Sequence, residues 1–156
     1  MMTTSQPRQA NQRGAARLAA VQALYQMDVG RQSLEETLAQ FNAFRLRGVE
    51  LEGEQYLPAD ADFFGQIVRG VIKGQIDIDP VVDNALSGWP MARIDATLRA
   101  ILRAGGWELL RRPDIPHGVV ITEYVDIAKA FFADDEPKLV NGVLDAIART
   151  ARPQNG

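Results

Sequence analysis

The chain has 156 residues, 46% of them hydrophobic and 24% charged, as expected of one compact domain that buries roughly 70% of its unfolded surface. The absence of cysteine excludes disulfides, thiolate metal sites and a cysteine nucleophile, and it suits a reducing compartment. Residues 1–17 contain no apolar signal-peptide core, and no uncharged apolar stretch is long enough to cross a bilayer, so we expect a cytoplasmic protein without membrane contact.

Basic and acidic residues are unevenly distributed along this chain of net charge −3. Residues 1–27 contain Arg8, Arg13 and Arg17 and no acid, whereas acids gather between residues 50 and 62. A local basic arm can bind phosphates while the acidic remainder keeps the protein soluble. The composition alone fits a disordered terminus with incidental arginines equally well. We expect a flexible basic arm at 1–11, a single helical domain at 12–150 and a flexible tail at 151–156.

Apolar residues recur at helical spacing in seven segments, and no segment shows the alternation of a strand. The first predicted helix runs from about Gln12 to Val29. Ser33-Leu34-Glu35-Glu36 is a capping box that opens the second. Residues 47–59 are predicted to form an acidic loop. Asp60 can cap the third helix, which Gly74 ends or bends.

Prolines delimit the next two predicted helices. Asp79-Pro80 is expected to start a short fourth helix, which Trp89-Pro90 ends. The fifth runs from Arg93 to Arg112, and inside it Gly105-Gly106 lowers helix propensity by about 2 kcal/mol. Because this pair lacks the preceding strand and the spacing of a phosphate loop, we interpret it as a site of close helix packing.

Pro116 begins the sixth predicted helix, whose inward face includes Phe131. The seventh lies between Pro137 and Arg149, so Asn141-Gly142, which would predict a hairpin turn between strands, lies inside a helix. Its glycine lowers helix propensity by about 1 kcal/mol, and we therefore expect a neighbouring backbone to pass close to it. Gly142→Leu should then destabilise the fold by roughly 1–3 kcal/mol through overcrowding.

Four stretches carry a resemblance to a known family: Arg17-Leu18-Ala19-Ala20-Val21-Gln22-Ala23-Leu24-Tyr25; Leu98-Arg99-Ala100-Ile101-Leu102-Arg103 with Trp107-Glu108-Leu109; Pro113-Asp114-Ile115-Pro116 with Glu123 and Ile127-Ala128-Lys129; and Lys138-Leu139-Val140-Asn141-Gly142-Val143-Leu144-Asp145. In this order they resemble the NusB transcription antitermination factors. Together they span almost the entire chain, which argues against chance. The resemblance implies an all-α fold of about seven helices in two roughly perpendicular three-helix bundles.

The same resemblance implies a binding protein rather than an enzyme, without cofactor or metal. It implies that the chain binds single-stranded boxA-type RNA together with ribosomal protein NusE, and that this pair joins the RNA polymerase elongation complex on ribosomal RNA operons. The residues agree. His117, the only histidine, stands at a helix start without a serine partner, where a solvated residue is the default. The acids at 134–136 are more typical of a helix cap than of a metal site.

Single-stranded RNA requires cations for its phosphates and planar or hydrogen-bonding groups for its bases. Arg13 and Arg17 are four residues apart and therefore share one helix face. The arginines at 111–112 could compensate a helix dipole rather than bind RNA, and Asp135 could be a helix cap. With the resemblance, the expected RNA-binding residues are Arg8, Arg13, Arg17, Gln22, Arg111, Arg112, Asp135 and Lys138.

The resemblance also indicates a protein-partner surface at Tyr25, Leu86 and Leu98. Tyr25 could alternatively stack on a base or pack in the core, and the partner could be NusE or a second copy of the chain. Leu139 stands where the family often has an aromatic residue, and Phe132 could substitute for it or pack in the core.

The basic arm is also thinner than is common in the family, and the 47–59 loop is longer. We therefore expect weak RNA binding by this chain alone, with NusE supplying further contacts. An alternative is a NusB-like helical adaptor with little RNA affinity. A third possibility, the NusB-like domain of an RNA cytosine methyltransferase, is disfavoured because cysteine and a cofactor-binding sheet are both absent from the sequence pattern.

Overall fold

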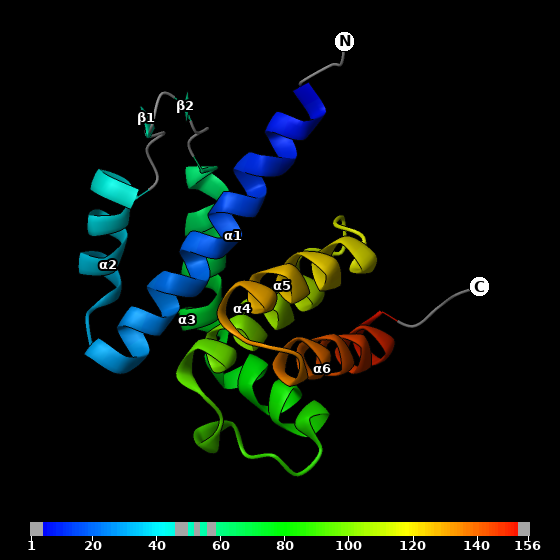
Figure 1. Cartoon of the computed structure of the whole chain (residues 1–156). Coiled ribbons are helices and arrows are strands. Elements are labelled where there is room, and N and C mark those ends of the chain that lie inside the picture. The colour runs from blue at the N-terminus through cyan, green and yellow to red at the C-terminus, as the bar shows by residue number, and fades with distance from the viewer. Residues whose placement is uncertain (1–4, 46–49, 52–53, 56–58, 153–156) are drawn as a thin grey trace. The chain divides into compact units, whose positions relative to one another are not determined.

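The computed structural model describes residues 5–45, 50–51, 54–55 and 59–152, with only the backbone at 5–11, 44–45, 50–51 and 54–55. Within these ranges the fold is all-α, as predicted (Figure 1). The six α-helices found there are α1 (Ser5–Gly30), α2 (Leu34–Gln40), α3 (Ala61–Leu86), α4 (Ala96–Arg111), α5 (His117–Phe131) and α6 (Asp135–Ala151). None of the described helices is both long and apolar enough to span a membrane.

Four short elements complete the described structure. A π-helical turn, η1 (Phe41–Arg45), continues α2, and a 3-10 turn, η2 (Met91–Arg93), precedes α4. The strands β1 (Glu50–Leu51) and β2 (Glu54–Gln55) pair antiparallel. The prediction that the 47–59 segment contains no strand is therefore wrong for these four residues; residues 47–49, 52–53 and 56–58 lie outside the described residues.

The third and fourth predicted helices are one helix, α3, so the predicted count of seven is too high by one among the described residues. Neither Gly74 nor Pro80 ends it. A proline inside a helix removes one hydrogen bond and costs about 3 kcal/mol. Ile78 and Val82, on either side of Pro80, are both completely buried. Burial of this apolar face offsets the local cost, because a fully buried valine or isoleucine side chain contributes about 1.5–3 kcal/mol.

Three helices begin at side-chain caps, of which those at Ser33 and Asp60 were predicted and the one at Asp95 was not. The Ser33 hydroxyl accepts from the Glu36 N–H at 3.1 Å, and the Glu36 carboxylate accepts from the Ser33 N–H at 3.2 Å, which confirms the capping box. Asp60 caps α3 by accepting from the Phe63 N–H at 3.0 Å. Asp95 caps α4 by accepting from the Thr97 N–H at 2.7 Å, so this helix starts at Ala96 and not at residue 93.

The two outer boundaries differ from the predictions. The helix α1 begins at Ser5 rather than near Gln12, and α6 continues to Ala151. The side chains of residues 5–11, including Arg8, and all of 153–156 lie outside the described residues, so the predicted flexible arm and tail stay predictions there.

The chain divides into two compact units, Met1–Arg69 and Gly70–Gly156, and each is described by itself. The first contains α1, α2 and the beginning of α3, with Ala16, Ala20 and Ala23 of α1 completely buried. Phe41 and Phe64 stack with ring centroids 5.5 Å apart. That residues 12–150 behave as a single domain stays a prediction.

In the second unit α4, α5 and α6 pack on one another. A Cβ on Gly105 would lie 2.9 Å from Leu144 Cδ1, and one on Gly106 would lie 3.3 Å from Val82 Cγ2, which confirms close packing at this glycine pair. The completely buried Glu108 accepts a 2.5 Å hydrogen bond from the Tyr124 hydroxyl of α5. A buried carboxylate therefore has a hydroxyl partner in the interior.

Two expectations for this unit are wrong. Phe131 is 45% exposed and does not face inward. Gly142 lies inside α6, as predicted, but it is exposed, and no neighbouring atom of the described residues lies within 4 Å of the place where its Cβ would stand. The expected close approach is absent, and with it the reason to expect overcrowding in Gly142→Leu.

Candidate nucleic-acid interface

Arg13 and Arg17 of α1 share one aromatic neighbour, the ring of Phe63. Their guanidinium carbons lie 5.1 and 5.0 Å from its centroid, so the two side chains do occupy the same helix face. The ring is positioned by the start of α3. The Asp60 side chain caps this helix by accepting from the Phe63 N–H, and the Asp60 N–H donates to the Gln12 carbonyl of α1 at 3.0 Å. Cation–π attraction favours this arrangement.

The two arginines differ in their availability to a ligand. Arg13 is exposed, whereas Arg17 is only 3% exposed. A phosphate needs an accessible guanidinium, so Arg13 is the better candidate, and Arg17 lies behind it against the same ring. Gln22, further along α1, is half-buried.

The expected partner-binding residues fall into two groups. Tyr25 is 42% exposed, so it is not a core residue and its ring is accessible to a protein or to a base. Leu86 and Leu98 are 3% and 4% exposed. Both belong to the interior, where they stabilise the fold and offer almost no surface to a partner.

Arg111 and Arg112, at the end of α4, are held differently. Arg112 forms a bidentate pair with Asp114, with distances of 2.9 and 2.8 Å, and its side chain is 21% exposed. Arg111 makes a longer contact of 3.4 Å with Asp77, and both side chains are more than half exposed. Exposed pairs of this kind contribute about 0–1 kcal/mol. Arg111 can therefore exchange its carboxylate for a phosphate more easily than Arg112 can.

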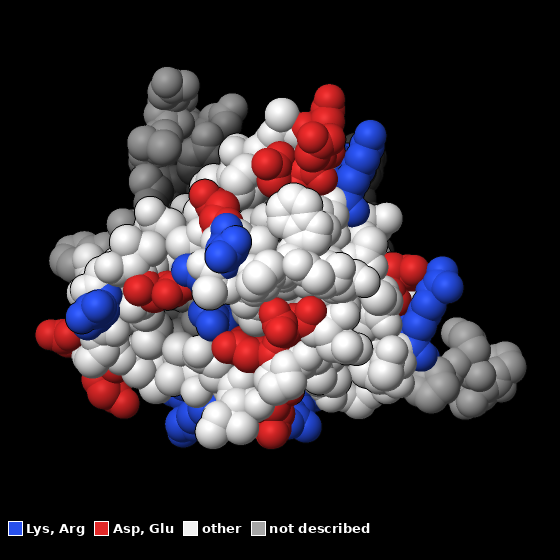
Figure 2. All heavy atoms as spheres, turned by 90° about the horizontal axis from the view of Figure 1, so that it is seen from below, with Lys and Arg blue, Asp and Glu red and all other residues white. Residues whose placement is uncertain are grey.

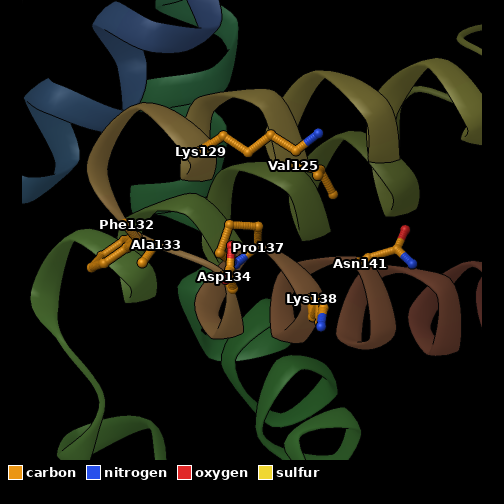
Figure 3. Close-up of a pocket in the computed structure, with 8 residues that line it drawn as sticks. All are labelled: Val125, Lys129, Phe132, Ala133, Asp134, Pro137, Lys138 and Asn141. Carbon is orange, nitrogen blue, oxygen red and sulfur yellow. The ribbon is translucent and has the colours of Figure 1, made fainter.

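A hollow of about 550 Å³ lies in the second unit where α5 leads into α6 (Figure 3). Its lining combines apolar side chains with two lysines, a carboxylate and an amide: Val125, Lys129, Phe132, Ala133, Asp134, Pro137, Lys138 and Asn141. Lys129 and Lys138 are exposed. Phe132 is half-buried at the hollow, and the centroids of its ring and the Phe131 ring are 6.5 Å apart. Phe132 is therefore not a core residue, which was one of the two roles expected for it.

The predicted capping role of Asp135 is wrong. The N-cap residue of α6 is Asp134, whose side chain makes no capping hydrogen bond, and Asp135 is the first residue of the helix. Its carboxylate is exposed beside the hollow's lining residue Asp134. An acid in a first helical turn still interacts favourably with the helix dipole.

On the face shown in Figure 2, the lysines and arginines of the described residues lie among acidic side chains and form no continuous basic patch. Among the side chains that the structure describes, no group of three or more histidines or acids could hold a metal ion. His117 is exposed at the start of α5, as predicted.

Comparisons with known proteins agree with the fold. The model of the NusB family matches residues 14–149. The transcription antitermination protein NusB of Brucella ovis is 56% identical over 154 residues, covering 98% of this chain and 90% of that protein. The protein of the same name from Rhodopseudomonas palustris strain TIE-1 is 58% identical over 154 residues, covering 98% and 88%.

Solved structures show the same architecture. A crystal form of T. maritima NusB is 31% identical, with a TM-score of 0.75 and coverage of 90% of this chain and 93% of that one. A chain in the crystal structure of antitermination factors NusB and NusE in complex with dsRNA is 24% identical, with a TM-score of 0.73 and coverage of 88% of this chain and 96% of that one. At that identity the likeness shows the fold alone.

Proposed function

The chain belongs to the NusB family, and on that basis we propose that it is a transcription antitermination factor that binds single-stranded boxA-type RNA together with ribosomal protein NusE. The pair would then act in the RNA polymerase elongation complex, in the cytoplasm and without catalysis. The observation that carries this proposal is the match of the family model along residues 14–149, with NusB relatives more than half identical along nearly the whole chain.

In this proposal the exposed cations bind phosphates. Arg13 is steadied by the Phe63 ring, which lowers the entropy it loses when a phosphate arrives. Lys138 stands at a hollow that also offers the aromatic Phe132 and the amide Asn141, a combination suited to an unpaired nucleotide. Arg111 offers a further exposed cation.

The remaining candidates have supporting roles in the proposal. Arg17, buried against the same ring as Arg13, keeps that ring and the neighbouring cation in place. Tyr25 is proposed to contact NusE, since an exposed tyrosine suits a protein interface. Gln22 and Asp135 are proposed to hydrogen-bond to bases, and Arg8 to add a phosphate contact.

The number of available cations sets the expected affinity. Three or four phosphate contacts to a single strand give a slope of about −2 to −3 for the logarithm of the binding constant against the logarithm of salt concentration. Binding of this kind is weak and salt-sensitive. A partner that adds its own cations, as NusE would, is therefore needed for tight binding.

The proposal is tested by titrating a fluorescently labelled boxA-like RNA with the chain, with and without NusE, at several salt concentrations. We expect tighter binding with NusE. Arg13→Ala and Lys138→Ala should each lower the affinity by about threefold and reduce the salt slope by about 0.7. Arg149→Ala is the matched control, because Arg149 is an exposed arginine of α6 that pairs with Asp145 at 3.0 Å.

Unchanged affinities in both variants would remove Arg13 and Lys138 from the site. The burial of Arg17 favours one alternative, a NusB-like helical adaptor with little RNA affinity. An adaptor would bind NusE, lose that binding in Tyr25→Ser, and leave the RNA affinity of NusE unchanged.

A further inference from the structure

The side chain of Arg152, the residue directly after α6, donates hydrogen bonds to four backbone carbonyls. Its Nε donates to the Leu109 carbonyl at 3.0 Å, and its Nη1 to the Ile115 carbonyl at 2.6 Å. Its Nη2 donates to the carbonyls of Glu108 at 3.1 Å and Arg112 at 2.7 Å. The sequence pattern predicted a loose tail from residue 151, so this anchor is a product of the tertiary structure.

The four acceptors lie at the end of α4 and in the turn that follows it. The last carbonyls of a helix lack partners within the helix, and they form the negative end of its dipole. A guanidinium offers five N–H donors in one plane and a permanent positive charge, so it can bind several such carbonyls together. Burial lowers the pKa of Arg152 from its ordinary value, whereas the charges of Glu108 and Asp114 raise it.

This anchor determines the position of the backbone around Arg111. The carbonyls of Leu109 and Arg112, before and after that residue, are both bound to Arg152. The side chain of Arg112 is in turn bound to Asp114. The turn is thus held by its backbone and by one of its own side chains, and the half-exposed Arg111 guanidinium is the part of it best placed to meet a ligand.

We propose that Arg152 is a positioning residue for RNA binding: it holds the end of α4 so that the Arg111 guanidinium meets a phosphate of the single strand. The inference rests on the proposed function. It implies that RNA binding depends on Arg152, the residue that follows α6. Arg152 itself does not touch the RNA. Its effect on affinity must therefore pass through Arg111.

Arg152→Lys separates charge from geometry, because lysine keeps the positive charge but lacks the planar fork of donors. The chain in complex with NusE is titrated with a labelled single-stranded RNA. Arg152→Lys should lower the affinity by about threefold, the range of one exposed ion pair. Arg149→Lys, the same change on an exposed arginine three residues earlier, should leave it unchanged.

A double-mutant cycle identifies the route of the effect. In an Arg111→Ala background, Arg152→Lys should cause no further loss of affinity. Hydrogen exchange should also accelerate at the amides of Arg112 and Ile115, which donate to Glu108 and Arg112 in the present turn, and should not change in Arg149→Lys. A purely structural role would lower the affinity by the same factor in both backgrounds.

Three results overturn the inference: wild-type affinity in Arg152→Lys, equal losses in the two backgrounds, or wild-type affinity in Arg111→Ala. The last result does not depend on whether the Arg152 variant folds. Failure of the proposed function is a different outcome, since the unmodified chain would then bind no RNA even with NusE.

Discussion

Gly105 in α4 and Gly142 in α6 lie in helix interiors and look equivalent in the sequence, yet their surroundings are opposite. A Cβ at position 105 would lie 2.9 and 3.0 Å from the two terminal carbons of Leu144. At position 142 the same atom would point into space that no neighbouring described residue occupies. A glycine in a helix lowers propensity by about 1 kcal/mol wherever it stands. The local cost therefore reveals that the glycine is unusual and does not reveal its purpose.

Among the glycines of these helices, the largest effect of an alanine is expected at Gly70 of α3, where an added Cβ would lie 2.1 Å from Trp107 Nε1. A rigid indole cannot yield as an aliphatic tip can, so Gly70→Ala should destabilise the protein by about 3 kcal/mol, the upper part of the overpacking range. Urea unfolding followed by circular dichroism measures the change. Adding Trp107→Leu should recover part of the loss; an unchanged midpoint in the single variant would mean that the indole rotates away at no cost.

Gly105→Ala is expected to cost less, about 1–2 kcal/mol, because the Leu144 tip is flexible and alanine regains helix propensity. The same unfolding measurement applies. A matched variant, Gly105→Ala with Leu144→Val, makes room for the new methyl group and should be less destabilised than the two separate changes predict. Strict additivity of the two changes would contradict the proposed contact.

Gly142→Ala should have the opposite sign. With an exposed position and no neighbour to displace, alanine should stabilise the protein by about 0.5–1 kcal/mol through helix propensity and a less flexible unfolded chain. Thermal unfolding should show a higher midpoint than for the unmodified chain. A lower midpoint would mean that a side chain at position 142 is crowded as one at position 105 is, so the two glycines would not differ.

The smallest effect is expected at Gly106, where the nearest atom to an added Cβ, Val82 Cγ2, lies at 3.3 Å. The gain in propensity and the strain of a few tenths of an ångström nearly cancel, so Gly106→Ala should change stability by less than about 0.5 kcal/mol. Its unfolding midpoint, measured beside those of the other variants, marks the distance at which crowding and propensity balance. A loss above 1 kcal/mol would mean that the packing here tolerates no adjustment.

Much of the fold was predictable because its signals are local. Capping by Ser33, Glu36 and Asp60 depends on residues within one turn, and each predicted bond is present. The merging of two predicted helices into α3 was not predictable, since local rules place a proline such as Pro80 at the start of a helix and not in its interior. Burial of the neighbouring Ile78 and Val82 overrides that rule, and burial depends on the rest of the unit.

The candidate site shows the same division. Four-residue spacing placed Arg13 and Arg17 on one face correctly, because spacing determines which helix residues are neighbours. Spacing could not separate the exposed arginine from the buried one, because both lie over the same Phe63 ring and burial depends on the packing of the whole unit. Nor could it find the bonds of Arg152, whose four acceptors lie far away along the chain.

The all-α fold, the starts of several helices and the family of this protein can be predicted from its sequence, because periodicity, caps and motifs depend on neighbouring residues. The packed structure is needed to show which glycines are crowded, which arginine is accessible to a phosphate, and what the residue after α6 binds. Those properties depend on atoms brought together from distant parts of the chain, where local propensity carries no information.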